Sequence, residues 1–316
     1  MSGDAIRIGI SACLLGERVR YDGGHKHDHY ITGTLGDYFE FVPVCPEAAI
    51  GLGIPRPTIR LVGEAEAPRV LGVRDARLDV TEKLIAFGKE MAPKLHDLRG
   101  YIFKRSSPSC GMERVKLYTE QGMPNGQSVG VYAREIMQAN PLLPTEEEGR
   151  LGDAGLRENF IQRVFVYDRW LRMVDAGLSS RGLVEFHTRH KTMIRAHDEI
   201  AYRELGRLVA EAGKRDLVAL AEEYVSRLMA TLKKPATRTK HSNVLMHLMG
   251  YLKQQLDSAD KQELIETIDE YRAGRLPLIV PIVLLRHHFR RHPNEYVADQ
   301  YYLDPHPREL MLRNAL

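Results

Sequence analysis

The strongest constraint on the fold is a change of sequence pattern near residue 150. In the first half, short apolar stretches typical of buried strands are separated by longer segments, one of which has helical periodicity. The strand-like stretches are IRIGISA (6–12), YFEFVPV (38–44) and GYIFK (100–104), and the helix-like segment is VTEKLIAFGKEMAPKLHDL (80–98). SVGVYAREI (128–136) is expected to run from a strand into a helix. This order predicts an α/β domain whose mainly parallel sheet is flanked by helices.

The second half has helical periodicity throughout, which predicts an all-α domain. Its apolar residues recur at helical spacing in segments that begin near residues 155, 179, 201, 217, 241 and 261. Between the halves, ANPLLPTEEEGRLGD (139–153) has two prolines and a run of acids, so we expect a domain boundary there. The predicted domains are residues 1–150 and 156–316.

Length and composition argue against a membrane-spanning or disulfide-rich chain. The longest apolar run, 276–285, contains two prolines and is too short to cross a bilayer. The first ten residues lack the basic start and apolar core of a signal peptide. Three distant cysteines do not make a disulfide framework. We therefore expect a cytoplasmic protein with reduced thiols and no membrane partner.

The charge is distributed unevenly between the two halves. Residues 1–149 carry 18 Lys and Arg against 20 Asp and Glu, a balance of −2. Residues 150–316 carry 27 against 22, a balance of +5, and hold nine of the thirteen histidines. A basic second half indicates a polyanionic partner, although a solvated basic face is the more common explanation of such a pattern.

Each cysteine follows one of the predicted strands. Cys13 and Cys45 come directly after 6–12 and 38–44, and Cys110 lies in the polar loop KRSSPSCG (104–111) that follows 100–104. The carboxyl ends of parallel strands share one edge of a sheet, where open α/β folds place their sites. If these strands are neighbours, the three thiols meet in one pocket.

Spacing alone leaves three interpretations of the cysteines open. They are small buried hydrophobic residues, ligands of a metal or cluster, or they include a lone nucleophile. No CxxC pair is present. A cubane cluster commonly has four thiolate ligands, so three thiolates would leave one iron as an open Lewis-acid position.

The flanks of the cysteines carry a family resemblance. ISACLLGERVRYDGGHK (10–26), PVCPEAAIGLGIPRP (43–57) and KRSSPSCG (104–111) together closely resemble the 2-thiouracil desulfidase (TudS) family. The helical half resembles the accessory domain of the RudS-type tRNA 4-thiouridine desulfidases, with FHTRHKTMIRAHD (186–198) and RHHFRRHPNEYVADQYYLDPHP (286–307) as its landmarks.

The resemblance implies an oxygen-sensitive [4Fe-4S] cluster on Cys13, Cys45 and Cys110. It also implies an enzyme that converts 4-thiouridine in tRNA to uridine, with thionucleosides or thiouracil as small substrates. Such a reaction is hydrolytic, because C=S becomes C=O, sulfide departs and no electron is transferred. One alternative is a desulfidase of free thiouracil or thionucleosides. Another is a non-catalytic nucleic-acid-binding protein with a structural metal or cluster.

Polar residues near the cysteines are candidates for the catalytic chemistry. Glu47, two residues after Cys45, is placed to act as a general base or proton donor, or else as a carboxylate at a helix N-terminus. Ser107 is expected to orient that base or the water, whereas Ser106 and Ser109 satisfy the turn or contact a cluster. Lys104 and Arg105 are either surface charges or groups that bind phosphate and stabilise developing charge. Asp22, in YDGG, either positions the substrate or caps a turn.

The remaining candidates are histidines and basic clusters. His25, His27 and His29 alternate as on an extended exposed segment, and His187, His190 and His197 lie near one helical face, where metal ligation and ordinary core or solvated positions are both open. Basic residues expected to contact RNA fall in KKPATRTKH (233–241), a predicted flexible loop, and in two predicted helical faces. They are Arg189, Lys191, Arg238, Lys240, Arg290 and Arg291.

Overall fold

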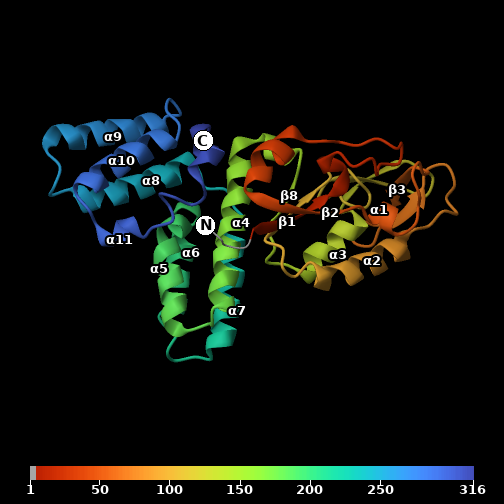
Figure 1. The fold of residues 1–316 in the computed structure, drawn as a ribbon, viewed down its shortest axis with the longest axis horizontal. Helices are drawn as coiled ribbons and strands as arrows, with labels where there is room; N and C mark the ends of the chain where they lie inside the picture. The colour runs from red at the N-terminus through yellow and green to blue at the C-terminus, as the bar shows by residue number, and fades with distance from the viewer. Residues whose placement is uncertain (1–4) are drawn as a thin grey trace. The chain divides into compact units, whose positions relative to one another are not determined.

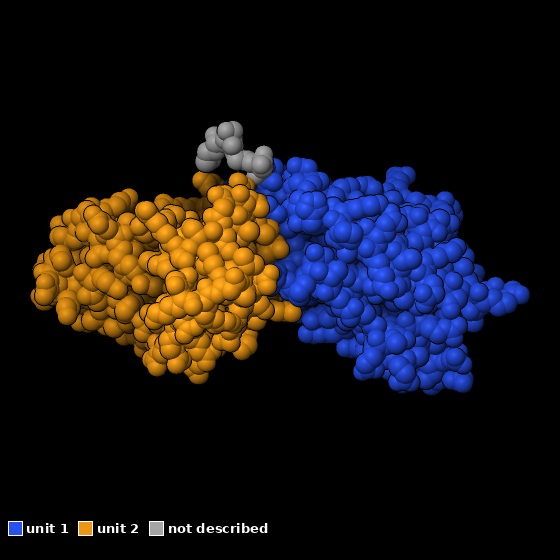
Figure 2. All heavy atoms as spheres, turned by 90° about the horizontal axis from the view of Figure 1, so that it is seen from below, with its two compact units in different colours: residues 1–152 blue, residues 153–316 orange. Residues whose placement is uncertain are grey.

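The computed structural model describes residues 5–316. The chain forms two compact units, residues 1–152 and 153–316 (Figure 2). The first is an α/β unit with a mainly parallel sheet and the second is all-helical, which confirms the predicted fold class (Figure 1).

The predicted strands form the first sheet of the α/β unit. β1 (Ile6–Ser11), β2 (Phe39–Val44), β5 (Gly100–Phe103) and β8 (Thr145–Glu147) pair in parallel in the order β2-β1-β5-β8. The central strand β1 is apolar because it is covered on both faces, and Ile8 and Ile10 have no exposed surface. A Cβ at Gly9 would lie 2.4 Å from the ring of Tyr101, so only glycine fits this close approach of β1 to β5.

A second, mixed sheet was not predicted from the sequence. Its order is β4-β3-β6-β7, built from β3 (Ile59–Val62), β4 (Arg69–Gly72), β6 (Val115–Tyr118) and β7 (Pro124–Ser128). The strands have only four or five residues, which is too short for a clear periodic signal. β7 ends where the predicted strand-to-helix segment 128–136 begins, so that prediction was right about the helix and placed the strand too late.

Two long helices lie side by side in the α/β unit (Figure 1). α2 (Thr81–Lys94) and α3 (Val131–Ala139) approach so closely at Gly88 that a Cβ there would lie 2.6 Å from the Cβ of Glu135. Tyr132 of α3 contacts Tyr101 of β5, while Leu84 and Val131 join the buried cluster under the second sheet. The helices therefore hold both sheets in one core. A short helix, α1 (Pro46–Ala49), follows β2.

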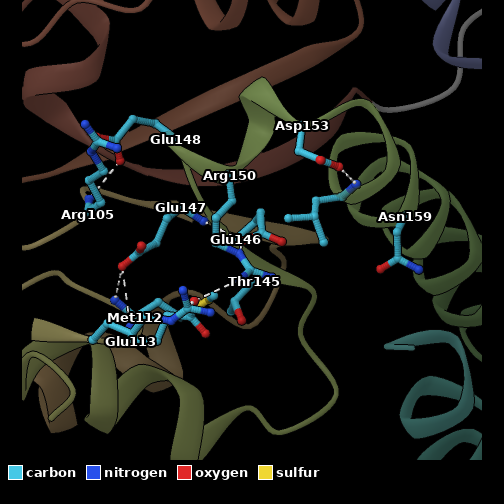
Figure 3. Close-up of polar contacts among 12 residues, drawn as sticks. Arg105, Met112, Glu113, Thr145, Glu146, Glu147, Glu148, Arg150, Asp153 and Asn159 are labelled. Carbon is cyan, nitrogen blue, oxygen red and sulfur yellow. Dashed lines mark hydrogen bonds and ion pairs between the residues drawn. The ribbon is translucent and has the colours of Figure 1, made fainter. Parts of the chain in front are cut away.

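The acidic run at 146–148 lies inside the segment 139–153, where we expected a domain boundary, and the two units divide after Gly152. The run itself is part of the α/β unit, because Glu146 and Glu147 lie in β8 and are buried. Glu146 pairs with Arg150 at 2.5 Å, and Glu147 accepts hydrogen bonds from the backbone N–H groups of Met112 at 2.8 Å and Glu113 at 3.4 Å (Figure 3). These acids act as internal acceptors because neighbouring loops supply the donors, which sequence order does not reveal.

The helical unit begins at α4, and side-chain caps set where its helices start. The helices are α4 (Ala154–Asp175), α5 (Ser180–His197), α6 (Glu199–Val209), α7 (Leu217–Leu232), α8 (Arg238–Met249), α9 (Ser258–Arg272), α10 (Ile279–Arg291) and α11 (Glu295–Ala298). Asp153, Ser179, Asp198, Asp216, Thr237, Asp257 and Asn294 each accept a hydrogen bond from the first turn of the helix that follows. No described helix is both long enough and apolar enough to cross a membrane.

The cap at Thr237 corrects one prediction. KKPATRTKH (233–241) was expected to be a flexible loop, but Arg238 to His241 form the first turn of α8. Short 3-10 or π turns complete the chain at Ala12–Leu15, Tyr30–Thr34, Leu35–Asp37, Arg150–Gly152, Gly250–Leu252, Arg308–Leu310 and Leu312–Asn314.

Candidate functional site

A cavity of about 370 Å³ lies at the carboxyl ends of β1, β2 and β5, and all three cysteines line it. Cys13 lies in the 3-10 turn after β1, Cys45 is the residue before α1, and Cys110 lies in the loop after β5. The three strands are parallel neighbours in the order β2-β1-β5, as the convergence of the three cysteines requires. The three residues come from sequence positions far apart and share one wall because their strands are parallel neighbours.

The thiols are buried and influence one another electrostatically. Burial is the main cause that raises the pKa of Cys13 to about 11, and the charge of Cys45 raises it further, while Lys104 and Arg20 oppose the shift. The pKa of Cys110 is well above its usual value, first because of burial and then because of Glu47, Cys45 and Cys13. Without a ligand the protein therefore favours neutral thiols at this edge of the sheet.

The donor set fits a cluster better than a single ion. Among residues 5–316 no group of three or more His, Cys, Asp and Glu is arranged to hold one metal ion. The ligands of a cubane bind different irons, so they need not converge on one point. Arg20, Lys26 and Lys104 also line the cavity, and their positive charge suits an anionic group held by thiolates.

Glu47 lies at the same cavity and is held by three side chains. Arg56 donates to its Oε2 through Nε at 2.9 Å and Nη2 at 2.8 Å, so two charged donors converge on one oxygen, with little exposure of either side chain. Ser109 Oγ donates to Oε1 at 2.9 Å. Ser107 Oγ lies 3.5 Å from the same oxygen, a long contact. These partners fix the orientation of the carboxylate.

The two serines have different positions in the Cys110 loop. Ser107 Oγ lines the cavity and accepts the backbone N–H groups of Ser109 at 3.2 Å and Cys110 at 3.1 Å, so it shapes the turn. Ser109 has no exposed surface and makes the closer contact with Glu47. We expected the orienting contact from Ser107, and the structure gives Ser109 the shorter one. Ser106 is an exposed residue at the rim with φ of 58°.

The N-terminus of α3 supports this loop from behind. The N–H groups of Gly130, Val131 and Ala133 donate to the carbonyls of Gly111, Pro108 and Ser109 at 2.8–3.0 Å. The first N–H groups of a helix have no partner within the helix, so the loop supplies the acceptors that α3 lacks. Cys110 is thereby tied to a regular element.

The two cations at the start of the loop behave differently. Lys104 Nζ forms a half-buried ion pair with Glu148, and its backbone N–H donates to Ser11 Oγ at 2.9 Å. Arg105 has an exposed side chain, and its backbone N–H donates to Glu148 at 2.7 Å (Figure 3). Both residues line the cavity, with Lys104 as a largely buried charge and Arg105 as an exposed one at the rim.

Asp22 and the histidines of the following segment do not line the cavity. Asp22 is exposed and accepts the N–H of Gly24 at 3.0 Å, which makes it a turn residue with a lowered pKa. His25, His27 and His29 are exposed as expected, but His29 has helical backbone angles at the start of the turn Tyr30–Thr34, so it does not continue an extended segment. His27 and His29 contact each other at a ring distance of 4.5 Å.

His187, His190 and His197 of the helical unit are core residues. His187 bonds to Tyr224 Oη at 3.1 Å, His190 to the carbonyl of Phe186 at 2.7 Å, and His197 to Gln162 at 2.8 Å. Burial lowers the pKa of each of them. They are buried neutral side chains and no metal group of the described chain includes them.

The structure separates the six proposed RNA contacts into three kinds. Arg238 donates to the carbonyls of Tyr271 and Leu276, and Lys240 to that of His197, so both help to hold the fold. Arg189 and Lys191 stack on tyrosine rings. Arg290 and Arg291, at the end of α10, are exposed and make no ion pair with a described residue.

Sequence reasoning missed Arg20, Arg56 and Glu148. Each is identified by an interaction that only the structure shows: Arg20 with Cys13, Arg56 with Glu47, and Glu148 with Lys104. The sequence held one indication that Arg56 pairs with a distant carboxylate. Arg56 stands between two prolines in GIPRP, and that segment has no acidic residue to neutralise its charge.

Two family models match different parts of the chain. Residues 8–148 match the family described as 2-thiouracil desulfurase, and residues 191–307 match the family described as "Protein of unknown function (DUF1722)". A solved structure described as the [4Fe-4S]-dependent thiouracil desulfidase TudS is 28% identical, with a TM-score of 0.36, over 46% of this chain and 93% of that chain.

The fold and the cavity thus define a desulfidase-class α/β domain followed by a helical DUF1722 domain. The protein YbgA of Escherichia coli (strain K12) is 33% identical over 154 residues, which cover 48% of this chain and 91% of YbgA. The chain belongs to the YbgA family.

Proposed function

We propose that this protein is a desulfidase that hydrolyses the C=S group of 4-thiouridine in tRNA to C=O, with a [4Fe-4S] cluster held by Cys13, Cys45 and Cys110. The observation that carries the proposal is the cavity in which the only three cysteines of the chain and a fixed carboxylate, Glu47, face the same space. The match of residues 8–148 to the 2-thiouracil desulfurase family supports the reaction class.

The cluster would supply a soft Lewis acid for the thiocarbonyl sulfur. The residues of the chain do the rest. Glu47 is positioned to take a proton from the attacking water at Oε1 or Oε2, with Arg56 and Ser109 holding the carboxylate in place. Lys104 and Arg20 supply positive charge at the cavity where negative charge develops on the substrate.

Thiolated tRNA is the proposed substrate because a basic helical unit follows the desulfidase domain. A free base needs no additional docking surface, whereas RNA phosphates need cations. Desulfidation of free thiouracil is the second candidate, and the description of the matched family favours it. A cytoplasmic location belongs to the same proposal, since a tRNA substrate and reduced thiols require it.

Anaerobic reconstitution with iron and sulfide tests the proposal. The wild type is expected to gain visible absorption and to release sulfide from 4-thiouridine in tRNA. Cys13→Ala, Cys45→Ala and Cys110→Ala should each lose iron, absorption and turnover while far-UV circular dichroism stays near native. A variant that keeps both iron and turnover would remove that cysteine from the site. Turnover of thiouracil alone would favour the second candidate, and a loaded but inactive protein would favour a structural cluster.

A further inference from the structure

The positive charges of the helical unit are neutralised unevenly. Many of its arginines pair with carboxylates, as Arg195 and Arg203 do with Glu199, and Arg215 and Arg227 with Glu223. Arg169 on α4, and Arg189 and Lys191 on α5, make no ion pair with any carboxylate in residues 5–316. Arg169 and Arg189 lie together at one tyrosine ring, so their charges add rather than cancel, and Lys191 lies at a second ring.

Each of these three cations stacks on a tyrosine ring. The guanidinium of Arg169 lies 3.9 Å from the ring centre of Tyr301, and that of Arg189 lies 4.6 Å from the same ring. Lys191 Nζ lies 4.4 Å from the ring centre of Tyr296. All five side chains are half-buried, so each cation keeps part of its surface open to solvent. We call Arg169, Arg189, Lys191, Tyr296 and Tyr301 the cation–tyrosine strip.

The segment that carries the tyrosines is fastened to α5. The N–H of Tyr301 donates to the carbonyl of Arg189 at 3.0 Å, and Gln300 Nε2 donates to that of Thr188 at 2.7 Å. Gln300 Oε1 accepts the N–H of Thr192 at 3.3 Å. The rings therefore have fixed positions relative to the helix.

The strip retains unused hydrogen-bonding capacity. Arg169 Nη1 and Arg189 Nε are buried and have no hydrogen-bond partner, although Arg169 Nη2 donates to the carbonyl of Pro305 at 2.5 Å. A buried donor without a partner is costly, and the cost is larger for a charged group. Asp168, next to Arg169, is engaged with Arg172 at 2.7 Å. Glu185 and Asp299 border the groove beside Arg189, but neither forms an ion pair with it.

Burial and neighbouring cations both act on the pKa values of groups at the strip. Burial lowers the pKa of Arg169 to about 10, and Arg189 contributes to that shift, whereas Tyr301 and Asp168 oppose it. Burial together with Arg169 and Arg189 also lowers the pKa of the neighbouring His190 to about 3. An anion at the strip would relieve this repulsion.

We infer that the cation–tyrosine strip binds backbone phosphates of the RNA substrate. The inference rests on the proposed function for the identity of that RNA, and on the structure for the place. Guanidinium groups present fork-shaped pairs of donors that match phosphate oxygens. Stacking on a tyrosine holds such a fork before the RNA arrives, so less side-chain entropy is lost on binding.

The test measures tRNA binding by the full-length chain, which needs no turnover. Arg189→Gln with Lys191→Gln removes two phosphate contacts, so we expect weaker binding by about tenfold or more and a flatter salt dependence by about two units of slope. Arg203→Gln with Arg215→Gln is the matched control, because it removes the same charge from arginines that are paired with Glu199, Glu211 and Glu223. Equal losses in the two double variants would overturn the inference, as would wild-type binding by the strip variant.

A second pair of variants tests the role of the ring. Tyr301 is a positioning residue that acts through its ring. Tyr301→Phe keeps the ring and should keep the affinity for tRNA. Tyr301→Leu removes the ring and should lower that affinity almost as much as Arg189→Gln does. Thermal melting of each variant controls for folding. Equal affinity of the Phe and Leu variants, with both at the wild-type value, would show that stacking does not prepare the site.

Two further outcomes separate the possible failures. Inorganic phosphate should displace tRNA no better than chloride at equal ionic strength, and stronger displacement would assign the strip to free phosphate and overturn the RNA inference. If the wild type desulfurates thiolated tRNA while strip variants bind and react normally, the inference fails and the proposed function stands. If tRNA binds through the strip but no sulfide is released, the proposed function fails and the inference stands.

Discussion

At the scale of single residues, Glu47 has its two carboxylate oxygens held by different partners. Arg56 occupies Oε2 through two donors, and Ser109 occupies Oε1 at 2.9 Å. A reactive group needs such support, because a small misplacement costs much of the rate. The cysteines define where a cluster would lie, and this small network defines where a proton acceptor lies beside it.

The first prediction separates the roles of the serines. Ser109→Ala should keep the visible absorption of the cluster and lower turnover by about 10- to 100-fold, the equivalent of one hydrogen bond to a charged group of about 1.5–3 kcal/mol. Glu47→Gln should lower turnover by about 10²- to 10⁴-fold with the cluster retained. Ser107→Ala should instead reduce iron content, because two N–H groups of the Cys110 loop lose their acceptor.

Ser106→Gly is the control for this series, since Ser106 is exposed at the rim and glycine adopts its positive φ of 58° without strain. It should have near-wild-type iron and turnover. Iron loss in Ser109→Ala would show that Ser109 supports the loop and not only Glu47.

The second prediction concerns stability at the same residues. Arg56→Met leaves the Glu47 carboxylate half-buried beside an apolar side chain, so we expect a loss of about 3–5 kcal/mol in the free energy of unfolding of the α/β unit. Glu47→Gln combined with Arg56→Met should lose less than Arg56→Met alone, because no charge is left without a partner. Urea unfolding of the apoprotein measures both. An additive double variant would mean that the pair is not coupled.

At the scale of elements, α3 and the Cys110 loop behave as one structural piece. The backbone of Gly130 is so close to the loop that a Cβ would lie 2.7 Å from the carbonyl carbon of Ser109 and 2.8 Å from the N of Gly111. Backbone atoms cannot move aside as a flexible side chain can. The cysteine and the helix must therefore move together.

The third prediction follows from that close approach. Gly130→Ala should push the loop away from α3, destabilise the α/β unit by about 1–3 kcal/mol or more, and lower iron retention. Gly33→Ala is the matched control, because no atom lies within 4 Å of its added Cβ and its φ is not positive. Normal iron content in Gly130→Ala would show that the loop adapts without moving Cys110.

The helices of the second unit bury several histidines in the neutral form. Burial is the first cause that lowers the pKa of His187 to about 4, and of His190 and His241 to about 3. An unfolded histidine has a pKa of about 6.5, so below that pH the unfolded chain binds protons that the folded chain does not. Stability of the helical unit therefore falls as the pH falls below about 6.5.

The fourth prediction gives the size and window of this effect. Between pH 6.5 and its folded pKa, each such histidine lowers the free energy of unfolding by up to about 1.4 kcal/mol for every unit that the pH falls. Glu158 also has a lowered pKa, because the nearby His306 and the charge of Arg313 outweigh burial, but its contribution to stability is lost only below its unfolded value of 4.5. Urea midpoints between pH 7.5 and 5 therefore report the histidines.

The single tryptophan, Trp170, lies in α4 against Phe186 and Tyr224, so its fluorescence follows the helical unit. In His187→Gln, stability should depend less steeply on pH, because the contribution of one buried histidine is lost. A midpoint that does not change over this pH range would contradict the buried neutral state.

At the scale of the whole molecule, two units with separate cores imply separate tasks. The cavity with the cysteines is built entirely from residues of the α/β unit. The unpaired cations of the strip, and Arg290 and Arg291, belong to the helical unit. The proposed chemistry and the proposed RNA docking should therefore be separable by mutation.

The fifth prediction uses salt to separate them. The kcat/KM for thiolated tRNA should fall steeply as salt rises, whereas that for a free thionucleoside should change little, because only tRNA binding releases many counterions. Arg290→Gln with Arg291→Gln should flatten the tRNA slope by up to about two units and leave nucleoside turnover unchanged. A parallel fall for both substrates would show that salt acts on the catalytic unit.

Local signals were sufficient to predict the strands β1, β2 and β5 and most helices of the second unit. Buried strands and amphipathic helices have their own periodicities, and residues such as Asp216 and Asp257 cap helices through contacts only three positions away. The position of a cysteine after each strand was visible in the same way. These features depend on neighbours in the sequence, so the sequence by itself determined them.

Other features depended on partners that are distant in sequence. The order β2-β1-β5 brought Cys13, Cys45 and Cys110 to one cavity, and the pairing of Glu47 with Arg56 and Ser109 gave the carboxylate its orientation. The second sheet and the burial of Glu146 and Glu147 also went unpredicted for this reason. A side chain becomes an ion-pair partner, an internal acceptor or a core residue only when the fold encloses it, so tertiary structure alone decided these roles.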